Sequence, residues 1–347
     1  MKKLIYIIIV SVIALTACEK TLDFPFEYKQ PKLVLNGLLS SNQEIEFFVS
    51  RSMHILDSKE IVMIPDADVI IFEDNKPLQG VPVYTLGVLY QAAYTPKVGH
   101  TYKFQISKDG FETIEAEAKM ENPTTINSFT GKIKGTEGGS ITYGGFFDVN
   151  LDFNDNPNEE NYYIVYVTCD MPEEVKDYFD LNSYGDDGDY KLNIECNDLS
   201  VNSSYNGDVL YLADEIINGG KYTMKFTAQD YRDIYGQFYE YEYYADNEEE
   251  EEDPEEGEDP EPDIEDLPFY REFEYKLIVH VATINKDYYQ YLKSFDLYNE
   301  NDGNPFAEPT IVKTNIKNGL GILGTSSEVT DTLRFTIKNP YLDEEEE

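Results

Sequence analysis

The sequence is poor in the residues that most often carry catalysis and metal binding. It has three Cys, three His and no Trp in 347 residues. His54, His100 and His280 lie far apart and form neither an HExxH motif nor a Cys/His set with the spacing of zinc ligands. The GxSxG motif of many hydrolases is missing as well. We therefore expect no metal, no cofactor and no catalytic residue, and a protein that is not an enzyme.

Basic residues are also scarce. Lys and Arg number 27 against 68 Asp and Glu, so the net charge is −41. Because a polyanion repels phosphate groups, this charge excludes nucleic acid as a partner and argues against a basic patch that binds anionic lipids. Hydrophobic residues make up 41% of the chain, which is enough for one or two packed cores.

Long hydrophobic runs are missing except near the N-terminus. After Lys2 and Lys3, residues 4–15 are apolar. A helix of this length spans about 18 Å, less than the ~30 Å core of a bilayer, so the run is typical of a secretory signal peptide. Residues 15–18 (LTAC) have the pattern of a bacterial lipobox, in which an aliphatic residue, Leu15, and two small residues, Thr16 and Ala17, precede Cys18.

We predict a lipoprotein signal peptide at residues 1–17 and acyl chains, such as palmitate, on Cys18. Two or more chains make such an anchor stable. The alternative is an ordinary signal peptide with a cysteine there by chance. Residues 18–31 would be a lipidated polar tether, in which Pro25 and Pro31 prevent a long helix.

The first part of the mature chain has the pattern of antiparallel strands. Apolar and polar residues alternate over 102–107 and again over 114–120, with the turn Lys108-Asp109-Gly110 between them. Alternation with period two is typical of strands with one buried face. We predict a small β-sandwich at residues 32–121, immunoglobulin-like or transthyretin-like.

The rest of the chain, residues 122–342, is predicted to be a second antiparallel β domain with one packed helix. Residues 162–168 are apolar on both faces and indicate a central strand, while the preceding segment 154–161 (NDNPNEEN) is interpreted as a turn. The helix is expected at 286–298, where Tyr288, Leu292 and Phe295 recur at helical spacing and would pack across the second sheet.

Two acidic segments stand apart from these domains. Residues 246–266 contain fifteen Asp and Glu broken by three prolines, and residues 343–347 form an acidic tail. Like charges at this density repel and proline blocks helix, so 246–266 is predicted to be a disordered insertion. A weak sink for divalent cations or a lure for a basic partner is the alternative, and we assign no metal.

Two cysteines remain after Cys18. Cys169 and Cys196 each share the parity of the apolar residues in their segments, so both are expected to face a core. In an oxidising compartment they are a candidate disulfide, and two inert buried thiols are the alternative.

Several segments carry a resemblance to a known family. They are CEK (18–20), PKLVLNGLL (31–39), PDADVIIFED (65–74), TPKVGHTYKFQISKDGFETIEAEA (95–118) and YYQYLKSFDLYNENDGNPFAEPTIVKTNIKNGLGILG (288–324). With them, the chain resembles a Bacteroidota lipoprotein family known as domain of unknown function 4249. Its members look like two-part β-proteins, and their genes often neighbour those of TonB-dependent outer-membrane receptors. The resemblance brings no catalytic residues.

The resemblance implies an outer-membrane lipoprotein that is a non-enzymatic accessory or binding partner of a TonB-dependent receptor. A surface adhesin or structural module is the alternative, and a hydrolase on a β-sandwich is a second alternative. Glu19 and Asp23 loosely resemble an acidic export signal, which favours the cell surface over the periplasmic face.

A loop after the predicted helix is the candidate docking site for a partner. Asn304, Pro305 and Phe306 form its centre, in a stiff, exposed segment. The alternative is a loop that only seals Phe306 onto the sheet.

Overall fold

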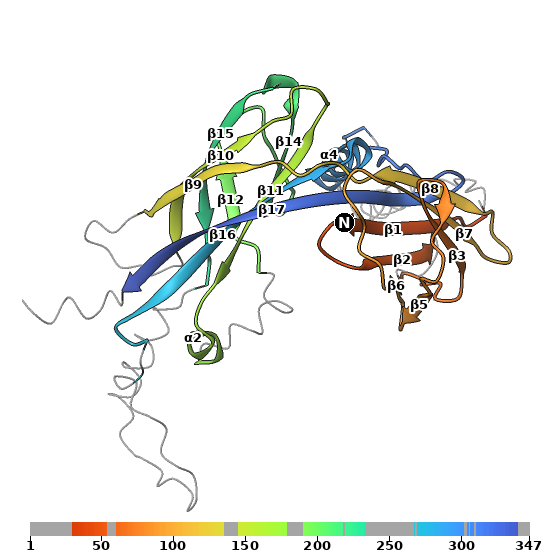
Figure 1. Ribbon diagram of the computed structural model, residues 1–347, viewed down its shortest axis with the longest axis horizontal. Coiled ribbons are helices and arrows are strands. Elements are labelled where there is room, and N and C mark those ends of the chain that lie inside the picture. Colours follow the sequence, from red (N-terminus) through yellow and green to blue (C-terminus); the bar gives the residue numbers. More distant parts are fainter. Residues whose placement is uncertain are drawn as a thin grey trace, which may run out of the picture.

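The computed structural model describes residues 30–53, 60–134, 145–178, 190–217, 219–232, 267, 269–301, 304, 306–308 and 310–338. The predicted signal peptide, Cys18, the tether up to residue 29, the insertion at 246–266 and the tail at 343–347 lie outside these residues. The described chain is mainly β, so the predicted fold class is confirmed (Figure 1). No helix in the described part is both long enough and apolar enough to cross a membrane.

Eight strands precede residue 120. They are β1 (Leu33–Ser40), β2 (Ile45–Arg51), β3 (Asp68–Glu73), β4 (Lys76–Pro77), β5 (Val83–Leu86), β6 (Leu89–Ala92), β7 (Thr101–Ser107) and β8 (Ile114–Lys119). The predicted alternation is confirmed in β7 and β8, where every second residue is buried.

Nine further strands follow. They are β9 (Ile126–Ile133), β10 (Phe146–Asn154), β11 (Tyr162–Asp170), β12 (Asn193–Cys196), β13 (Asn202–Ser203), β14 (Val209–Ala213), β15 (Lys221–Gln229), β16 (Glu272–Ile284) and β17 (Leu320–Lys338). The helices are α2 (Glu173–Tyr178), the 3-10 turn η3 (Asp214–Ile216) and α4 (Lys286–Asn301). Strand β11 is buried on both faces and lies between β14 and β16, so the predicted central strand is confirmed.

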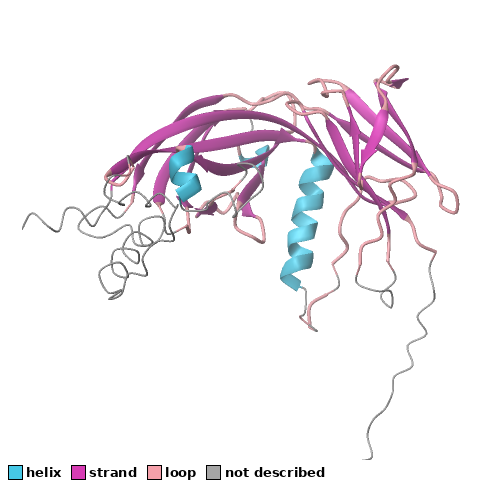
Figure 2. Cartoon of the chain, turned by 90° about the horizontal axis from the view of Figure 1, so that it is seen from below, coloured by secondary structure: helices cyan, strands magenta, loops and turns pink. Residues whose placement is uncertain are grey.

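The strands form one long sheet and two short ones. The long sheet has nine strands in the order β13-β14-β11-β16-β17-β1-β2-β6-β5. The short sheets are β12-β15-β10-β9 and β4-β3-β7-β8. Figure 1 shows β17 running from one half of the molecule into the other, and Figure 2 shows the strands arching over both halves.

The first sandwich packs the β1-β2-β6 end of the long sheet against β3, β7 and β8. Phe47 lies at its centre, stacked on Tyr90 at 5.0 Å and edge-on to Phe104 at 5.1 Å. Its core also includes Ile316 and Leu323 from the far end of the chain. The start of β17 pairs with β1 in parallel, so residues after 314 complete the sandwich that the sequence assigns to 32–121 alone.

The second sandwich packs β11, β14, β16 and the second half of β17 against β9, β10, β12 and β15. In its core the Phe147 ring stacks on Tyr275 at 5.0 Å and lies 5.0 Å from Phe335. Strand β17 thus serves both cores, because its nineteen residues are long enough to cross the boundary between them. The two cores therefore share one continuous sheet.

Helix α4 begins where the sequence predicts it and continues to Asn301. Its first turns contact the sheet through Tyr289, which lies 4.9 Å from the ring of Tyr162 and 5.8 Å from that of Tyr211. The predicted packing on the sheet is thus found in the first turns, through Tyr289, Tyr288 and Leu292, and it does not extend to the C-terminal half of the helix. Phe295 is 39% exposed and Tyr298 is 47% exposed, and Figure 2 shows the longer helix standing away from the sheet.

Candidate functional site

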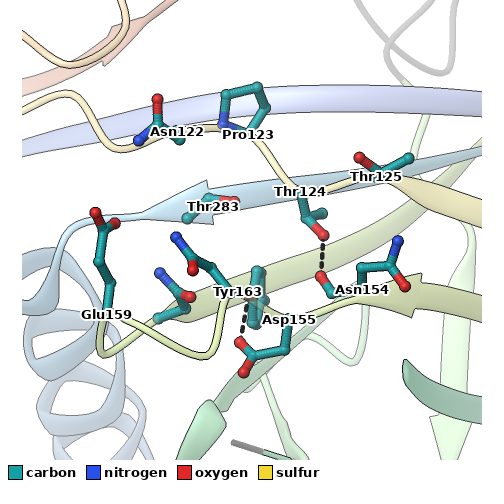
Figure 3. Close-up of a pocket in the computed structure, with 11 residues that line it drawn as sticks. Asn122, Pro123, Thr124, Thr125, Asn154, Asp155, Glu159, Tyr163 and Thr283 are labelled. Carbon is teal, nitrogen blue, oxygen red and sulfur yellow. Dashed lines mark hydrogen bonds between the residues drawn. The ribbon is translucent and has the colours of Figure 1, made fainter. Parts of the chain in front are cut away.

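A polar cavity of about 150 Å³ lies at the junction of the two sandwiches (Figure 3). Three pieces of chain form it: the linker between β8 and β9, the turn between β10 and β11, and the end of β16. The lining residues are Asn122, Pro123, Thr124, Thr125, Asn154, Asp155, Asn156, Glu159, Asn161, Tyr163 and Thr283. The linker is the predicted domain boundary, and the turn is the segment that the sequence left without a role.

The linker is tied to the end of β10. Thr124 Oγ1 donates a hydrogen bond to the carbonyl oxygen of Asn154, and the Asn154 N–H donates to the carbonyl oxygen of Thr125 at 3.0 Å. The amides of Asn127 and Asn154 also pair, at 2.7 and 3.0 Å. These bonds fix one wall of the cavity against the second sandwich.

Asp155 is the buried carboxylate of the cavity, with 6% of its surface exposed. Its Oδ1 accepts a hydrogen bond from the Tyr163 hydroxyl at 2.7 Å, and its Oδ2 accepts one from the Gly219 N–H at 2.7 Å. Burial, together with this bond to Asp155, raises the pKa of Tyr163, so its hydroxyl stays a proton donor. Each carboxylate oxygen keeps a second lone pair for another partner.

Thr283 is the residue opposite Tyr163 in the pairing of β11 with β16. It is 1% exposed, and its Oγ1 has no hydrogen-bond partner among the described residues. Leaving a buried hydroxyl unpaired costs about 1–3 kcal/mol. Because Thr283 lines the cavity, this oxygen is available to whatever enters it.

Asn161 brings a third feature. Its backbone N–H donates to Asp214 Oδ2 at 2.8 Å, and its carbonyl oxygen accepts from the Asp214 N–H at 3.0 Å. Its side-chain amide is satisfied with the nitrogen toward Asp155, where it donates to Asp155 Oδ1 at 3.3 Å and to the Asn156 carbonyl oxygen at 3.2 Å.

The lining of the cavity is negative. It has two carboxylates, Asp155 and Glu159, and no Lys, Arg or His. The nearby cations are engaged elsewhere, since Lys119 pairs with Glu121 at 2.6 Å and Lys286 with Glu160 at 2.9 Å. The cavity can therefore take a cation or a neutral polar molecule, and it repels anions.

A second polar network lies on the face of the long sheet away from the second core. Thr168 Oγ1 is 2.9 Å from His280 Nε2, and His280 Nδ1 is 3.0 Å from Glu328 Oε1. The Tyr166 ring stacks on His280 at 4.3 Å, and its hydroxyl donates to Glu328 Oε2 at 2.6 Å. Burial would raise the pKa of Glu328, but the bonds from His280 and Tyr166 outweigh it and lower that pKa.

This network has the order of a nucleophile, a base and an orienting acid. Thr168, however, is only 5% exposed, and the stacked Tyr166 ring covers His280. The hydroxyl is therefore closed to a substrate in this conformation. The sequence interpretation of His280 as a residue within a strand is confirmed, because it lies in β16.

The candidate disulfide between Cys169 and Cys196 is not formed, and both thiols are free. The Cys169 sulfur lies 2.7 Å from Arg232 Nη2, beside the buried Arg232–Asp230 ion pair, whose closest N–O distance is 2.8 Å. Cys196 Sγ donates to the carbonyl oxygen of Lys225 at 3.4 Å. The two thiols belong to different sheets and have different partners, which sequence parity could not reveal.

Burial, followed by the charge of Asp230, raises the pKa of Cys169 to about 12. Burial also raises the pKa of Cys196. Because the thiolate is the reactive form, Cys169 is chemically inert at neutral pH. The alternative of an inert buried thiol holds for Cys169, whereas Cys196 is only partly buried.

The predicted docking loop lies beyond the far end of α4. Asn304 and Phe306 are described there, and Pro305 is outside the described residues. Asn304 Oδ1 accepts a hydrogen bond from the Phe306 N–H at 3.1 Å, while Phe306 is 95% exposed. The alternative in which the loop seals Phe306 onto the sheet is therefore wrong.

After this loop the chain returns along α4. Asn301 Nδ2 donates to Thr310 Oγ1 at 3.0 Å, and the Lys313 N–H donates to Ser294 Oγ at 2.8 Å. We call α4 together with residues 304, 306–308 and 310–313 the α4 arm. Its exposed large apolar residues are Phe295, Leu297, Tyr298, Phe306 and Ile311.

Sequence reasoning missed the junction cavity. The segment 154–161 is dense in Asn and Asp, which was the one available signal, but the same density is typical of turns. Thr283 gave no signal, since it stands in an apolar strand.

Comparison with known proteins supplies the family. The family model described as a domain of unknown function (DUF4249) matches residues 19–332. A comparison with curated proteins finds no match. The family match covers most of the 347 residues and includes the first sandwich, the junction cavity, the α4 arm and the second sandwich except the end of β17. This chain belongs to the DUF4249 family.

Proposed function

We propose that this protein is a lipid-anchored outer-membrane lipoprotein that acts as a non-enzymatic binding partner of a TonB-dependent receptor. The observation that carries the proposal is the α4 arm, whose helix projects from the sheet (Figure 2). Its apolar side chains Phe295, Leu297, Tyr298, Phe306 and Ile311 are exposed. The arm supplies a docking surface, and the lipid on Cys18 keeps it at the membrane.

The apolar residues of the arm argue for a partner. Phe306 is 95% exposed, Ile311 is 83% exposed and Leu297 is 48% exposed. Single exposed apolar residues are ordinary, but five on one projecting element favour an interaction site. Aromatic residues are enriched in the cores of interfaces, which fits Phe295, Tyr298 and Phe306.

The receptor is named because of the family resemblance. Genes of this family often lie beside those of TonB-dependent receptors, and a lipoprotein held by Cys18 would share the outer membrane with such a barrel. The net charge of −41 makes an anionic lipid surface a poor alternative target for the arm. The proposal also includes exposure of the protein on the cell surface instead of the periplasmic face of the outer membrane.

A pull-down in mild detergent tests the partnership. A C-terminally tagged chain with Cys18 intact should retain a TonB-dependent barrel. The double variant Tyr298→Ser/Phe306→Ser should retain at least about tenfold less, since two interface aromatics together contribute 2 kcal/mol or more. Leu86→Ser is the matched control, because Leu86 is 67% exposed but lies in β5, at the edge of the long sheet.

Two results would contradict the proposal. One is a preparation that retains no outer-membrane barrel; if deletion strains then lost attachment and kept normal nutrient uptake, the adhesin alternative would replace it. The other is equal retention of the barrel by the arm variant and the control. Cys18→Ala tests the anchor separately and should move the protein from the membrane fraction to the soluble fraction.

A further inference from the structure

We infer that the face of the long sheet turned away from the first core is a docking surface for residues 22–28 of this chain. This segment lies in the predicted tether between Cys18 and β1. The inference goes beyond receptor docking by the α4 arm, because it concerns another surface and another occupant.

The first sandwich buries one face of the long sheet and leaves the other face open. Buried residues alternate with open ones along β1 and the first half of β2. We call the open face of β1, β2, β6 and β5 the outer face, and its apolar residues are Val34, Leu38, Phe48, Tyr84, Leu86 and Leu89. Leu38 and Phe48 are each 41% exposed, and Leu86 is 67% exposed.

The strand register makes these side chains neighbours. Phe48 is opposite Leu89, and Leu89 is opposite Leu86. Leu38 is diagonal to Phe48, because Asn36 is the residue opposite Phe48. Side chains that are opposite or diagonal on one face of a sheet lie within about 8 Å of each other. The outer face is therefore one contiguous apolar surface, which is uncommon unless something covers it.

Helix α4 borders the outer face. Gly324 is the residue beside Leu38 in the pairing of β1 with β17. A Cβ atom on Gly324 would lie 2.8 Å from the Tyr288 ring and 3.0 Å from Leu38 Cδ1, so this ring rests next to Leu38. The rings of Tyr291 and Phe295 continue the stack along the helix, at 6.3 and 5.7 Å. The outer face thus lies on the side of the sheet from which α4 projects (Figure 2).

The outer face is almost without charge. Charged residues make up 27% of the chain, yet residues 77–96, which contain β5 and β6, have none. At the outward positions of the four strands, Glu46 is the one charged residue, and it accepts a hydrogen bond from Gln91. Such a surface suits an apolar ligand and offers little attraction to a charged one.

The segment before β1 has a matching pattern. In residues 22–28 (LDFPFEY) every even-numbered residue is apolar, and Asp23, Pro25 and Glu27 stand between them. Alternate side chains of an extended chain point to opposite sides. An extended segment could therefore place Leu, Phe, Phe and Tyr on the outer face and turn both carboxylates to water.

The segment is attached at the edge of this face. The Lys32 N–H donates to Ser52 Oγ at 2.9 Å, and the Ser52 N–H donates to the Lys32 carbonyl oxygen at 2.8 Å. Crossing from β1 to β5 takes three strand spacings, or about 14 Å, whereas seven extended residues span about 23 Å. Residues 29–32 remain for the turn back over the sheet, so the segment is long enough.

The attachment also favours this occupant over others. A segment on a short linker has an effective concentration in the millimolar range, which a separate protein does not reach. A second copy of the chain is repelled by the net charge of −41. With a lipid on Cys18, which is part of the proposed function, binding of residues 22–28 would shorten the spacer from about 40 Å to about 14 Å. The bound segment would then hold the first sandwich close to the membrane.

A single tryptophan tests the docking, because the chain has no Trp. The probe is Phe26→Trp in the mature chain with Cys18→Ala, which carries no lipid and needs no detergent. The indole should emit at a shorter wavelength than in the urea-unfolded chain, and acrylamide should quench it severalfold less. Dilution of the protein should change neither reading, since the contact is intramolecular.

Two further substitutions locate the contact. Tyr84→Asp and Phe48→Ser each put a polar group on the outer face, so each should move the emission to longer wavelength and restore most of the quenching. Ile70→Asp is the matched control, because Ile70 is 47% exposed on β3, in the other sheet of the first sandwich, and Tyr84 is 45% exposed. Circular dichroism during urea unfolding checks that each variant is folded.

Three results would overturn the inference. The first is an indole as exposed in the folded chain as in the unfolded chain. The second is a protected indole that neither Tyr84→Asp nor Phe48→Ser affects, which would place the segment elsewhere. The third is protection that disappears on dilution, which would make a second copy the occupant. None of these results affects the receptor pull-down, which tests the α4 arm.

Discussion

The two sandwiches differ in what they bury. The first has an apolar core of Leu, Ile, Val and aromatic side chains around Phe47 and Phe104. The second and its junction bury Asp155, Asp214 and Asp230. Burying a charged carboxylate costs free energy unless it is paired with a cation or hydrogen-bonded, so each buried carboxylate in this region needs well-placed partners. The stability of the second region should therefore depend more on hydrogen bonds and ion pairs, and that of the first more on apolar packing.

The largest expected effect is a cavity in the scaffold. Phe104 is 0% exposed and packs edge-on to Phe47, so Phe104→Ala should lower the free energy of unfolding by about 4 kcal/mol. Urea unfolding followed by far-UV circular dichroism measures the loss. Phe48→Ala is the control, because Phe48 is 41% exposed in β2 of the same sandwich and should cost less than about 1 kcal/mol.

The next effect tests whether the second core depends on its buried pair. Asp230→Ala leaves the guanidinium of Arg232, which is 8% exposed, without its partner and should cost about 3 kcal/mol. The double variant Asp230→Ala/Arg232→Met should be more stable than the single variant, because no charge is left buried. A double variant less stable than the single one would mean that Arg232 packs chiefly through its stem, and the contrast between the cores would weaken.

A smaller loss of stability is expected when the same substitution, Tyr to Phe, is made in each sandwich. Tyr102 donates to Glu73 at 2.8 Å in the first, and Tyr163 donates to Asp155 at 2.7 Å in the second. Tyr102→Phe and Tyr163→Phe should each lower the free energy of unfolding by about 1–2 kcal/mol. Tyrosine fluorescence during urea unfolding can follow both, because the chain has no Trp.

The smallest effect is on acid stability. Burial opposes the shift, but Tyr94 and Tyr102 lower the pKa of Glu73, and His280 and Tyr166 lower that of Glu328. When the pKa of a carboxyl is lower in the folded chain, the carboxyl stabilises the fold at a pH above its pKa in the unfolded chain, which is about 4.5. This contribution disappears as the pH falls through the pKa of the folded state.

At pH 7, Glu73→Gln and Glu328→Gln should therefore each have a lower free energy of unfolding than wild type. Between pH 5 and pH 3, the free energy of unfolding of each variant should fall less than that of wild type. Unfolding midpoints in urea at pH 7, 5, 4 and 3 give the comparison. If the urea midpoint of a variant falls as steeply as that of wild type from pH 5 to pH 3, the wild-type carboxyl at that position is not held in the charged form by these bonds.

Much of the β-structure was readable from local pattern. Alternation in 102–107 and 114–120 placed β7 and β8, and apolar residues on both faces of 162–168 indicated the central position of β11. Helical spacing of Tyr288, Leu292 and Phe295 found α4, but it could not tell how much of the helix meets the sheet. Parity likewise placed Cys169 in a core without revealing Arg232 beside it.

The sequence by itself determined that this is an acidic β-protein and located its long helix, because composition and the periodic spacing of apolar residues are local properties. The lipid anchor stays a prediction of the same kind. Only the tertiary structure decided that β17 pairs with β1 and serves both cores, and that Asp155 and Thr283 meet at one cavity. Those meetings join residues more than a hundred positions apart, and the pairing of a strand depends on which partner buries its apolar face, which no local pattern encodes.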